Sequence, residues 1–209
     1  LEILDSSNIY YFDSTQYIKN NLKNNLYESP VFYKSGIHWS NAWGKRSAAQ
    51  FLDYMNQNSK YMMAKVSVTE TSSSAPIDPD TDLYSSLNLL NKPNEKWYAA
   101  EMTVDVPGKD RPNVFFRGGS FMGQSLSALI RTGVFEYDIY FQNNYYFTNQ
   151  FSKKATLSSF TAYDEIDLDS FVGQSDILIL EVNVNAISNM NWGFVEYLLD
   201  HPDYFDKDY

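Results

Sequence analysis

The feature that most constrains the fold is a strand-turn-helix pattern in the middle of the chain. Residues 112–117, PNVFFR, form the apolar and aromatic run of a buried strand. The run ends in Gly118-Gly119-Ser120, and apolar residues then recur at helical spacing at Met122, Leu126, Leu129 and Ile130. Gly133 supplies a helix stop. A strand that turns directly into a helix is typical of an α/β fold.

The same alternation extends over the rest of the chain. Further strands are expected at 8–13, 31–34, 61–70, 96–105 and 176–182, and further helices around 17–22, from Ser40 to Met55, and at 82–90 and 193–201. The run at 176–182, DILILEV, predicts a strand buried on both faces. This order predicts one α/β domain of 209 residues with a mostly parallel sheet covered on both sides.

Composition excludes several classes of function. A net charge of −10 repels phosphate backbones, so nucleic acid is a poor partner. The chain has no cysteine, which excludes disulfides, thiolate nucleophiles and cysteine-ligated zinc. No apolar run approaches 18 residues, and the first residues, LEILDSSN, lack a signal pattern. We expect the full-length protein to carry an N-terminal anchor or export signal ahead of Leu1.

Ser120 and His38 are the candidates for an acyl-transfer site. A serine hydroxyl needs a base within hydrogen-bond reach and donors that face the developing oxyanion. The Gly118-Gly119 turn and the following helix N-terminus offer backbone N–H donors beside Ser120, Gly119 among them. Of the two histidines, His201 lies in an acidic tail segment, whereas His38 follows an expected strand and precedes a helix.

Other residues suit substrate contacts as well as plain structural roles. Arg131 either contacts substrate oxygens or solvates a helix end, and the Asn183 amide either donates to an oxyanion or holds a loop. Aromatic side chains that either stack on sugar rings or pack in the core are Trp39, Trp43, Tyr140, Tyr145 and Tyr146. The run Asp78-Pro79-Asp80-Thr81-Asp82 lacks the Gly and Glu of a calcium loop, so we expect a solvated loop, no metal and no cofactor.

Two segments carry a family resemblance. VFYKSGIHWSNAWGKRSAAQFLDYM resembles the D-x-H-W-(S/T/N)-x-x-G stretch, and VFFRGGSFMGQSL resembles the G-D-S-F stretch, of the AlgX/AlgJ-like alginate O-acetyltransferase branch of the SGNH-hydrolase superfamily. The order, with the histidine first, also matches that branch. The late run DILILEVNVNAISNMNWGF is similar at Glu181, Asn183 and Gly193-Phe194, so the resemblance spans about residues 5 to 200.

The resemblance implies an SGNH-hydrolase-like three-layer α/β/α domain over residues 1–209, outside the cytoplasmic membrane of a bacterial cell envelope. It implies that Ser120 accepts an acetyl group, that His38 is base and then acid, and that a polysaccharide hydroxyl receives the group. A membrane-bound O-acyltransferase would supply the acetyl groups. The alternatives are an SGNH-type carbohydrate acetylesterase and a non-catalytic glycan-binding module of a polysaccharide export or acetylation system.

The chain departs from this family at two aspartates. Gly36 stands where the aspartate two residues before the histidine is expected, and Gly119 where the aspartate before the nucleophile is expected. The carboxylate that orients His38 must therefore come from elsewhere. The candidates are Asp82, Asp13, Asp80 and Glu181, and the sequence does not choose among them.

Overall fold

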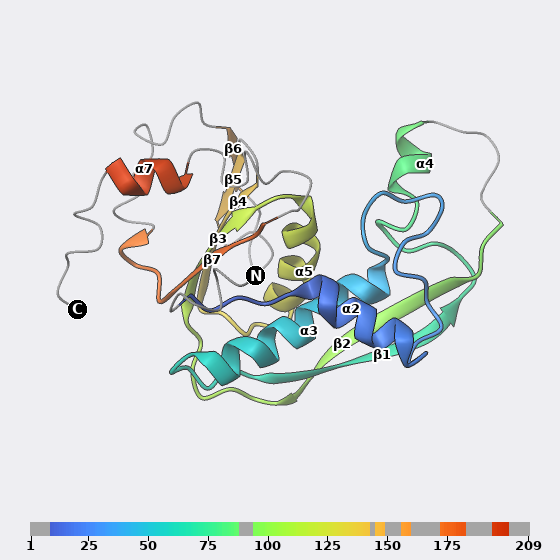
Figure 1. The fold of residues 1–209 in the computed structure, drawn as a ribbon, viewed down its shortest axis with the longest axis horizontal. Coiled ribbons are helices and arrows are strands. Elements are labelled where there is room, and N and C mark those ends of the chain that lie inside the picture. The colour runs from blue at the N-terminus through green and yellow to red at the C-terminus, as the bar shows by residue number, and fades with distance from the viewer. Residues whose placement is uncertain are drawn as a thin grey trace. The chain divides into compact units, whose positions relative to one another are not determined.

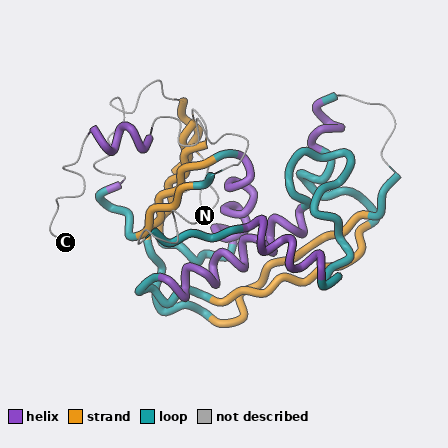
Figure 2. Tube along the Cα trace, viewed as in Figure 1, coloured by secondary structure: helices purple, strands orange, loops and turns teal. Residues whose placement is uncertain are grey.

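The computed structural model describes residues 9–87, 94–142, 145–148, 156–159, 172–182 and 194–200. The chain divides into two compact units, Leu1–Lys109 and Asp110–Tyr209, called unit 1 and unit 2 below (Figures 1 and 2). Each unit combines helices with strands, which confirms the α/β class. The single three-layer domain stays a prediction.

Unit 1 is built around one long helix on a two-stranded sheet (Figure 1). Helix α3 (Asn41–Asn58) begins where the sequence predicts, because the Ser40 hydroxyl accepts a hydrogen bond from the Trp43 N–H. Its apolar face packs on the antiparallel strands β1 (Lys65–Ser73) and β2 (Trp97–Val106). The buried residues of α3 and β2 include Trp43, Ala48, Leu52, Trp97, Tyr98 and Ala100. Both strands belong to a sheet of their own.

Two strands expected in unit 1 are absent. Residues 9–13 and 31–34 lie in loops, before helix α2 (Ser14–Lys23) and before α3. Tyr33 is buried between exposed neighbours because its ring packs on Trp97 and its hydroxyl accepts from the Tyr98 N–H at 3.1 Å. One buried aromatic between exposed residues imitates the alternation of a strand without any ladder of backbone hydrogen bonds.

Unit 2 contains a five-stranded sheet in the order β6-β5-β4-β3-β7. Its strands are β3 (Asn113–Gly118), β4 (Tyr137–Gln142), β5 (Tyr145–Thr148), β6 (Thr156–Ser159) and β7 (Ile177–Leu180). β3 pairs in parallel with β4 and β7, whereas the pairs β4–β5 and β5–β6 are antiparallel. The sheet is therefore mixed, with a parallel core of three strands.

The expected strand-turn-helix pattern is present at the centre of unit 2. β3 is followed by helix α5 (Ser120–Arg131), and Gly133 has a φ of 72° two residues after the helix ends. Helix α7 (Phe194–Asp200) contributes Phe194, whose ring stacks on that of Phe115 with centroids 5.2 Å apart. The buried residues here include Val114, Phe115, Phe116, Leu126 and Leu129.

Strand β7 does not fit the prediction of a strand buried on both faces. Ile179 is buried, but Leu178 and Leu180 are 39% and 41% exposed. β7 is an edge strand of the described sheet, where it pairs with β3. Alternate side chains of a strand point to opposite faces, and here one of the two faces remains accessible.

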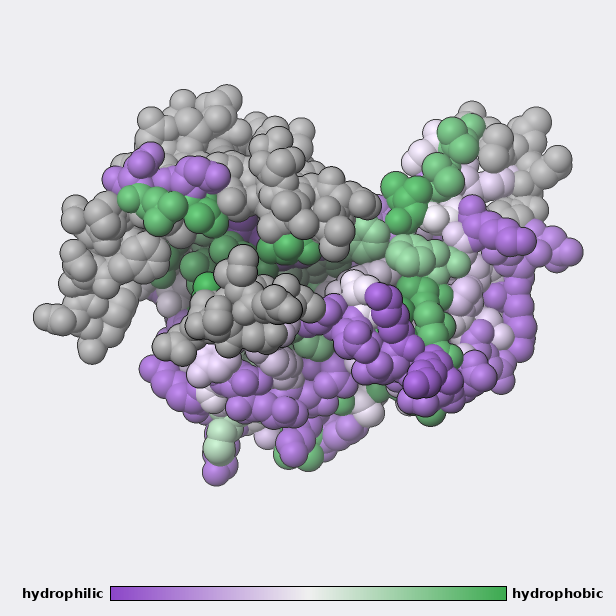
Figure 3. Space-filling view, in the orientation of Figure 1, coloured by the Kyte–Doolittle hydropathy of each residue, from purple (hydrophilic) through white to green (hydrophobic). Residues whose placement is uncertain are grey.

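Apolar side chains also reach the surface of unit 1, next to the short helix α4 (Asp82–Ser86; Figure 3). Ile37 is 56% exposed, and Leu87, which follows α4, is 59% exposed. Exposed apolar residues are thus present on the segments that carry His38 and Asp82. Within the described part of the chain, the helices are too short or too polar to cross a bilayer.

Candidate functional site

Two loops of unit 1 meet at His38. We call residues 35–41 the histidine loop and residues 77–83 the acid loop. The His38 Nδ1 lies in a short contact with Oδ2 of Asp82, and both side chains are about one-fifth exposed. The other oxygen, Asp82 Oδ1, accepts the backbone N–H of Ile37 at 2.8 Å and of Leu83 at 2.7 Å. Of the candidate acids in unit 1, it is thus Asp82 that orients the imidazole.

The contact fixes the chemistry of the imidazole. An ionised carboxylate can only accept, so a neutral His38 must carry its proton on Nδ1 and leave Nε2 as an acceptor. Burial raises the pKa of Asp82, but the hydrogen bonds from His38, Ile37 and Leu83 outweigh burial and hold that pKa below its usual range. Asp82 is therefore ionised near neutral pH, as the orienting member of a Ser-His-Asp triad must be.

Gly36 explains why the acid comes from another loop. A Cβ at position 36 would lie 3.0 Å from the Asp80 carbonyl oxygen and 3.4 Å from Asp82 Oδ1. The acid loop therefore fills the space beside the backbone of Gly36. At the position where the family resemblance expects an aspartate, this chain has room for the carboxylate of Asp82 instead.

Asp80 makes a second connection between the same two loops. Its side chain is 1% exposed, and its Oδ1 accepts the N–H of Asn41, the first residue of α3, at 2.8 Å. Its Oδ2 accepts the N–H of Ile77 at 3.2 Å, within the acid loop. Burial is the main cause that raises the pKa of Asp80 to about 6.

Ser120 in unit 2 occupies the helix position that the sequence predicts. β3 ends at Gly118, Gly119 is the N-cap, and Ser120 is the first residue of α5. Gly119 has no side chain to cap the helix, and Glu181 takes that role. Its Oε2 accepts the N–H of Gly119 at 2.6 Å and the N–H of Met122 at 3.3 Å.

Glu181 reaches this point from the end of β7, where its own N–H donates to the Arg117 carbonyl at 2.8 Å. A Cβ at Gly118 would lie 2.7 Å from both Cβ and Oε2 of Glu181, so only glycine fits between the two strands. The Gly119 N–H, which we expected to face an oxyanion, donates to Glu181 instead in this structure. Its role in an oxyanion hole stays a prediction.

The remaining predicted site residues belong to several different elements of the two units. Asp13 caps α2 by accepting the N–H of Gln16 at 2.9 Å. Arg131 is exposed at the end of α5, and Trp39 is half-buried in the histidine loop beside His38. Tyr145 begins β5. Asn183 and His201 lie outside the described residues.

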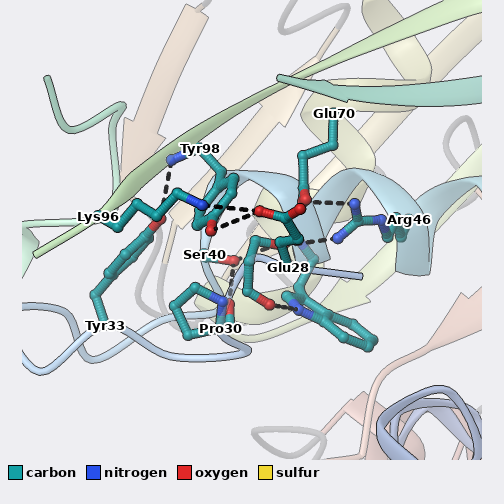
Figure 4. Close-up of polar contacts among 10 residues, drawn as sticks. Glu28, Pro30, Tyr33, Ser40, Arg46, Glu70, Lys96 and Tyr98 are labelled. Atoms are coloured by element: carbon teal, nitrogen blue, oxygen red, sulfur yellow. Dashed lines mark hydrogen bonds and ion pairs between the residues drawn. The ribbon is translucent and has the colours of Figure 1, made fainter. Parts of the chain in front are cut away.

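Trp43 does not line a groove. It is 1% exposed, and its indole N–H donates to the Ser29 carbonyl at 2.9 Å. Near it, Arg46 donates to Ser29 Oγ at 2.8 Å and to Glu70 at 2.5 Å, and its guanidinium lies 3.6 Å from the ring centre of Tyr27. This pairing holds α3 on β1 (Figure 4).

A pocket of about 260 Å³ lies beside Arg46, lined among others by Tyr27, Glu28, Glu70 and Tyr98. Figure 4 shows Glu28 held by Lys96 and by the Tyr98 hydroxyl, at 2.8 and 3.1 Å. No sequence signal predicted this cluster. Within the described ranges, no three His, Asp or Glu side chains are grouped so that they could hold a metal ion.

Comparison with protein-family models, with curated proteins and with solved structures found no match to this chain. His38 and Asp82 belong to unit 1, and Ser120 and Glu181 belong to unit 2.

Asp82→Asn is expected to reverse the tautomer of His38. The two backbone donors, Ile37 and Leu83, keep the amide oxygen in the place of Oδ1, so the amide NH₂ faces His38 Nδ1. Nδ1 must then accept, and the proton moves to Nε2. The ¹⁵N chemical shifts of the ring report this change directly. An unchanged Nδ1–H tautomer in the variant would contradict the assignment of Asp82.

Gly36→Asp, which restores the residue that the family resemblance expects, should disturb the packing of the acid loop against residue 36 and lower the stability of the protein. The new side chain has to displace the Asp80 carbonyl and adds a second carboxylate beside Asp82. We expect a loss of about 1–3 kcal/mol in the free energy of unfolding, measured by urea denaturation. Gly36→Ala is the control for bulk without charge. A Gly36→Asp protein as stable as wild type would show that the acid loop is not packed there.

The pKa of Asp80 predicts a pH dependence of stability. The folded-state pKa of about 6 exceeds the ordinary aspartate value of 3.8, so the folded protein binds this proton more tightly than the unfolded chain. Asp80 therefore lowers the free energy of unfolding as pH rises from about 4 to about 6, by at most about 3 kcal/mol. Nearby Asp78 and Glu95 act in the same direction.

The measurement compares wild type with Asp80→Asn in urea at pH 4.5 and pH 7. The wild type should lose stability relative to the variant as pH rises. The lowered pKa of Asp82 has the opposite effect, because it raises the free energy of unfolding as pH rises. That effect falls at pH values below the ordinary pKa of an aspartate, so it adds little between pH 4.5 and pH 7. An equal difference between the two proteins at both pH values would contradict the prediction.

Proposed function

We propose that this protein is an extracytoplasmic, SGNH-type O-acetyltransferase that modifies hydroxyl groups of an exported polysaccharide through an acetyl-Ser120 intermediate. The observation that carries the proposal is the Asp82 carboxylate on His38 Nδ1, which supplies the acid that the sequence lacks at Gly36. Further support comes from Ser120 at the turn between β3 and α5 and from the resemblance of the two segments that carry these residues.

In the first half-reaction, Nε2 of His38 accepts the Ser120 hydroxyl proton while Oγ attacks the carbonyl carbon of an acetyl ester. The tetrahedral intermediate collapses with loss of the donor alcohol, which takes the proton back from His38. The products are the free alcohol and acetyl-Ser120. Throughout, Asp82 keeps the Nδ1–H of the ring in place and stabilises the imidazolium that forms.

In the second half-reaction, a sugar hydroxyl gives its proton to Nε2 and attacks the acetyl carbonyl. Ser120 leaves and recovers its proton from His38, so that the acetyl group ends on the polysaccharide. A membrane-bound O-acyltransferase is the proposed source of acetyl groups. Water in place of the sugar would give the esterase reaction, so the exclusion of water decides between the two outcomes.

One observation favours a second function, a non-catalytic glycan-binding module. The Glu181 carboxylate accepts the N–H groups of Gly119 and Met122 at the start of α5. A negative charge held at these donors opposes the oxyanion that would develop at an acyl-Ser120. The transferase therefore requires that other donors stabilise the oxyanion or that Glu181 leaves this position during the reaction.

A short pulse of 4-nitrophenyl acetate distinguishes the two functions. The wild type should gain one acetyl group, found on Ser120 by peptide mass spectrometry, and Ser120→Ala should gain none there. Ser127→Ala, on the same helix, is the matched control and should behave as wild type. Absence of the acetyl group from wild-type Ser120 would favour the binding module.

A chase with neutral and acidic oligosaccharides then separates transferase from esterase. Faster loss of the acetyl group together with acetylated oligosaccharide supports the transferase. Release of free acetate alone, at a rate that no oligosaccharide changes, would contradict the transferase proposal.

A further inference from the structure

The acid loop is fastened to the histidine loop at several points besides the Asp82–His38 contact. The Ser35 hydroxyl donates to the Asp80 carbonyl oxygen at 3.0 Å, and the N–H of Tyr84, the residue that follows the acid loop, donates to the Ser35 carbonyl at 3.0 Å. The acid loop itself turns twice, with the Asp80 N–H on the Ile77 carbonyl and the Asp82 N–H on the Pro79 carbonyl. The position of Asp82 therefore depends on how this loop is held.

The buried carboxylate of Asp80 joins the acid loop to the start of α3. One of its oxygens accepts from Asn41 in the helix, and the other accepts from Ile77 in its own loop. Asn41 is three residues after His38, and Asp80 is two residues before Asp82. Asp82 and Asp80 thus both connect the acid loop to the histidine loop. Asp82 does so at His38, and Asp80 does so at Asn41.

We infer that Asp80 is a positioning residue of the proposed active site, which holds the acid loop on the first turn of α3 so that Asp82 stays on His38 Nδ1. The effect of Asp80 on the reaction of Ser120 rests on the proposed function. Its effect on the position of Asp82 does not. Burial of this carboxylate also raises its pKa, so its ionised form costs stability near neutral pH. A neutral residue of similar size would avoid that cost but would keep at most one of the two accepting oxygens.

The test uses the full chain and two pairs of variants. Asp80→Asn replaces one accepting oxygen with an NH₂ group that cannot accept a backbone N–H. Asp78→Asn is its control, because Asp78 is an exposed carboxylate of the same loop. Asn41→Pro removes the N–H that Asp80 accepts while it suits the first helical position, and the preceding Ser40, at φ −58° and ψ 154°, tolerates a following proline.

Asn41→Ala is the control for the proline variant. It keeps the N–H and loses only the contact of the Asn41 side chain with the Asp78 carbonyl. The comparison of the two therefore isolates the backbone donor. The pair also keeps the test open if Asp80→Asn fails to fold.

The first readout is the ¹⁵N and ¹H NMR signal of the His38 ring, which does not depend on activity. In wild type, Asp78→Asn and Asn41→Ala we expect the Nδ1–H tautomer and a downfield Nδ1 proton. In Asp80→Asn and Asn41→Pro we expect that proton signal to be lost and both tautomers to be populated. Folded variants that all keep the wild-type signal would overturn the inference.

The second readout is the rate at which 4-nitrophenyl acetate acetylates Ser120. Misplacement of the base by about 1 Å should slow this step about 100-fold in Asp80→Asn and Asn41→Pro, with no change in the controls. An unchanged rate in variants whose ring signal has changed would overturn the catalytic part of the inference. A wild type that is never acetylated would instead refute the proposed function, and the ring signals would still decide the role of Asp80.

Discussion

The hydrogen bond between Asp82 and His38 is the interaction on which the rest of the candidate site depends. It joins two loops that are 44 residues apart in sequence and gives the imidazole a defined tautomer. With it, Nε2 is an acceptor, and a serine hydroxyl is the kind of group from which it can take a proton.

Near both candidate catalytic residues, a glycine stands where an aspartate is expected, and a carboxylate from a distant segment lies there instead. Where the family resemblance expects an aspartate at position 36, glycine leaves room for the acid loop, and Asp82 supplies the carboxylate. Where it expects one at position 119, glycine again has no side chain, and Glu181 accepts the N–H groups at the start of α5. In both places the negative charge is kept near a candidate catalytic residue, but it comes from another segment.

The sequence predicts the caps and turns around the candidate residues better than it predicts strands and their long-range pairing. The cap at Ser40 and the turn before Ser120 depend on neighbouring residues, and both predictions are confirmed. The separate sheet of β1 and β2 depends on which strands pair across a connection of more than twenty residues, which periodicity does not encode. For the same reason the sequence leaves Asp82 as one candidate among four and does not predict the cap formed by Glu181.

The central proposal is that His38 activates Ser120, and reaction with a fluorophosphonate tests it most directly. This reagent phosphonylates a serine whose proton is removed by a base, and peptide mass spectrometry gives the rate at each serine. We predict that wild type is labelled at Ser120 and that His38→Ala is labelled there about 10² to 10⁴ times more slowly. Equal labelling of Ser120 in both proteins, or none in wild type, would contradict the account.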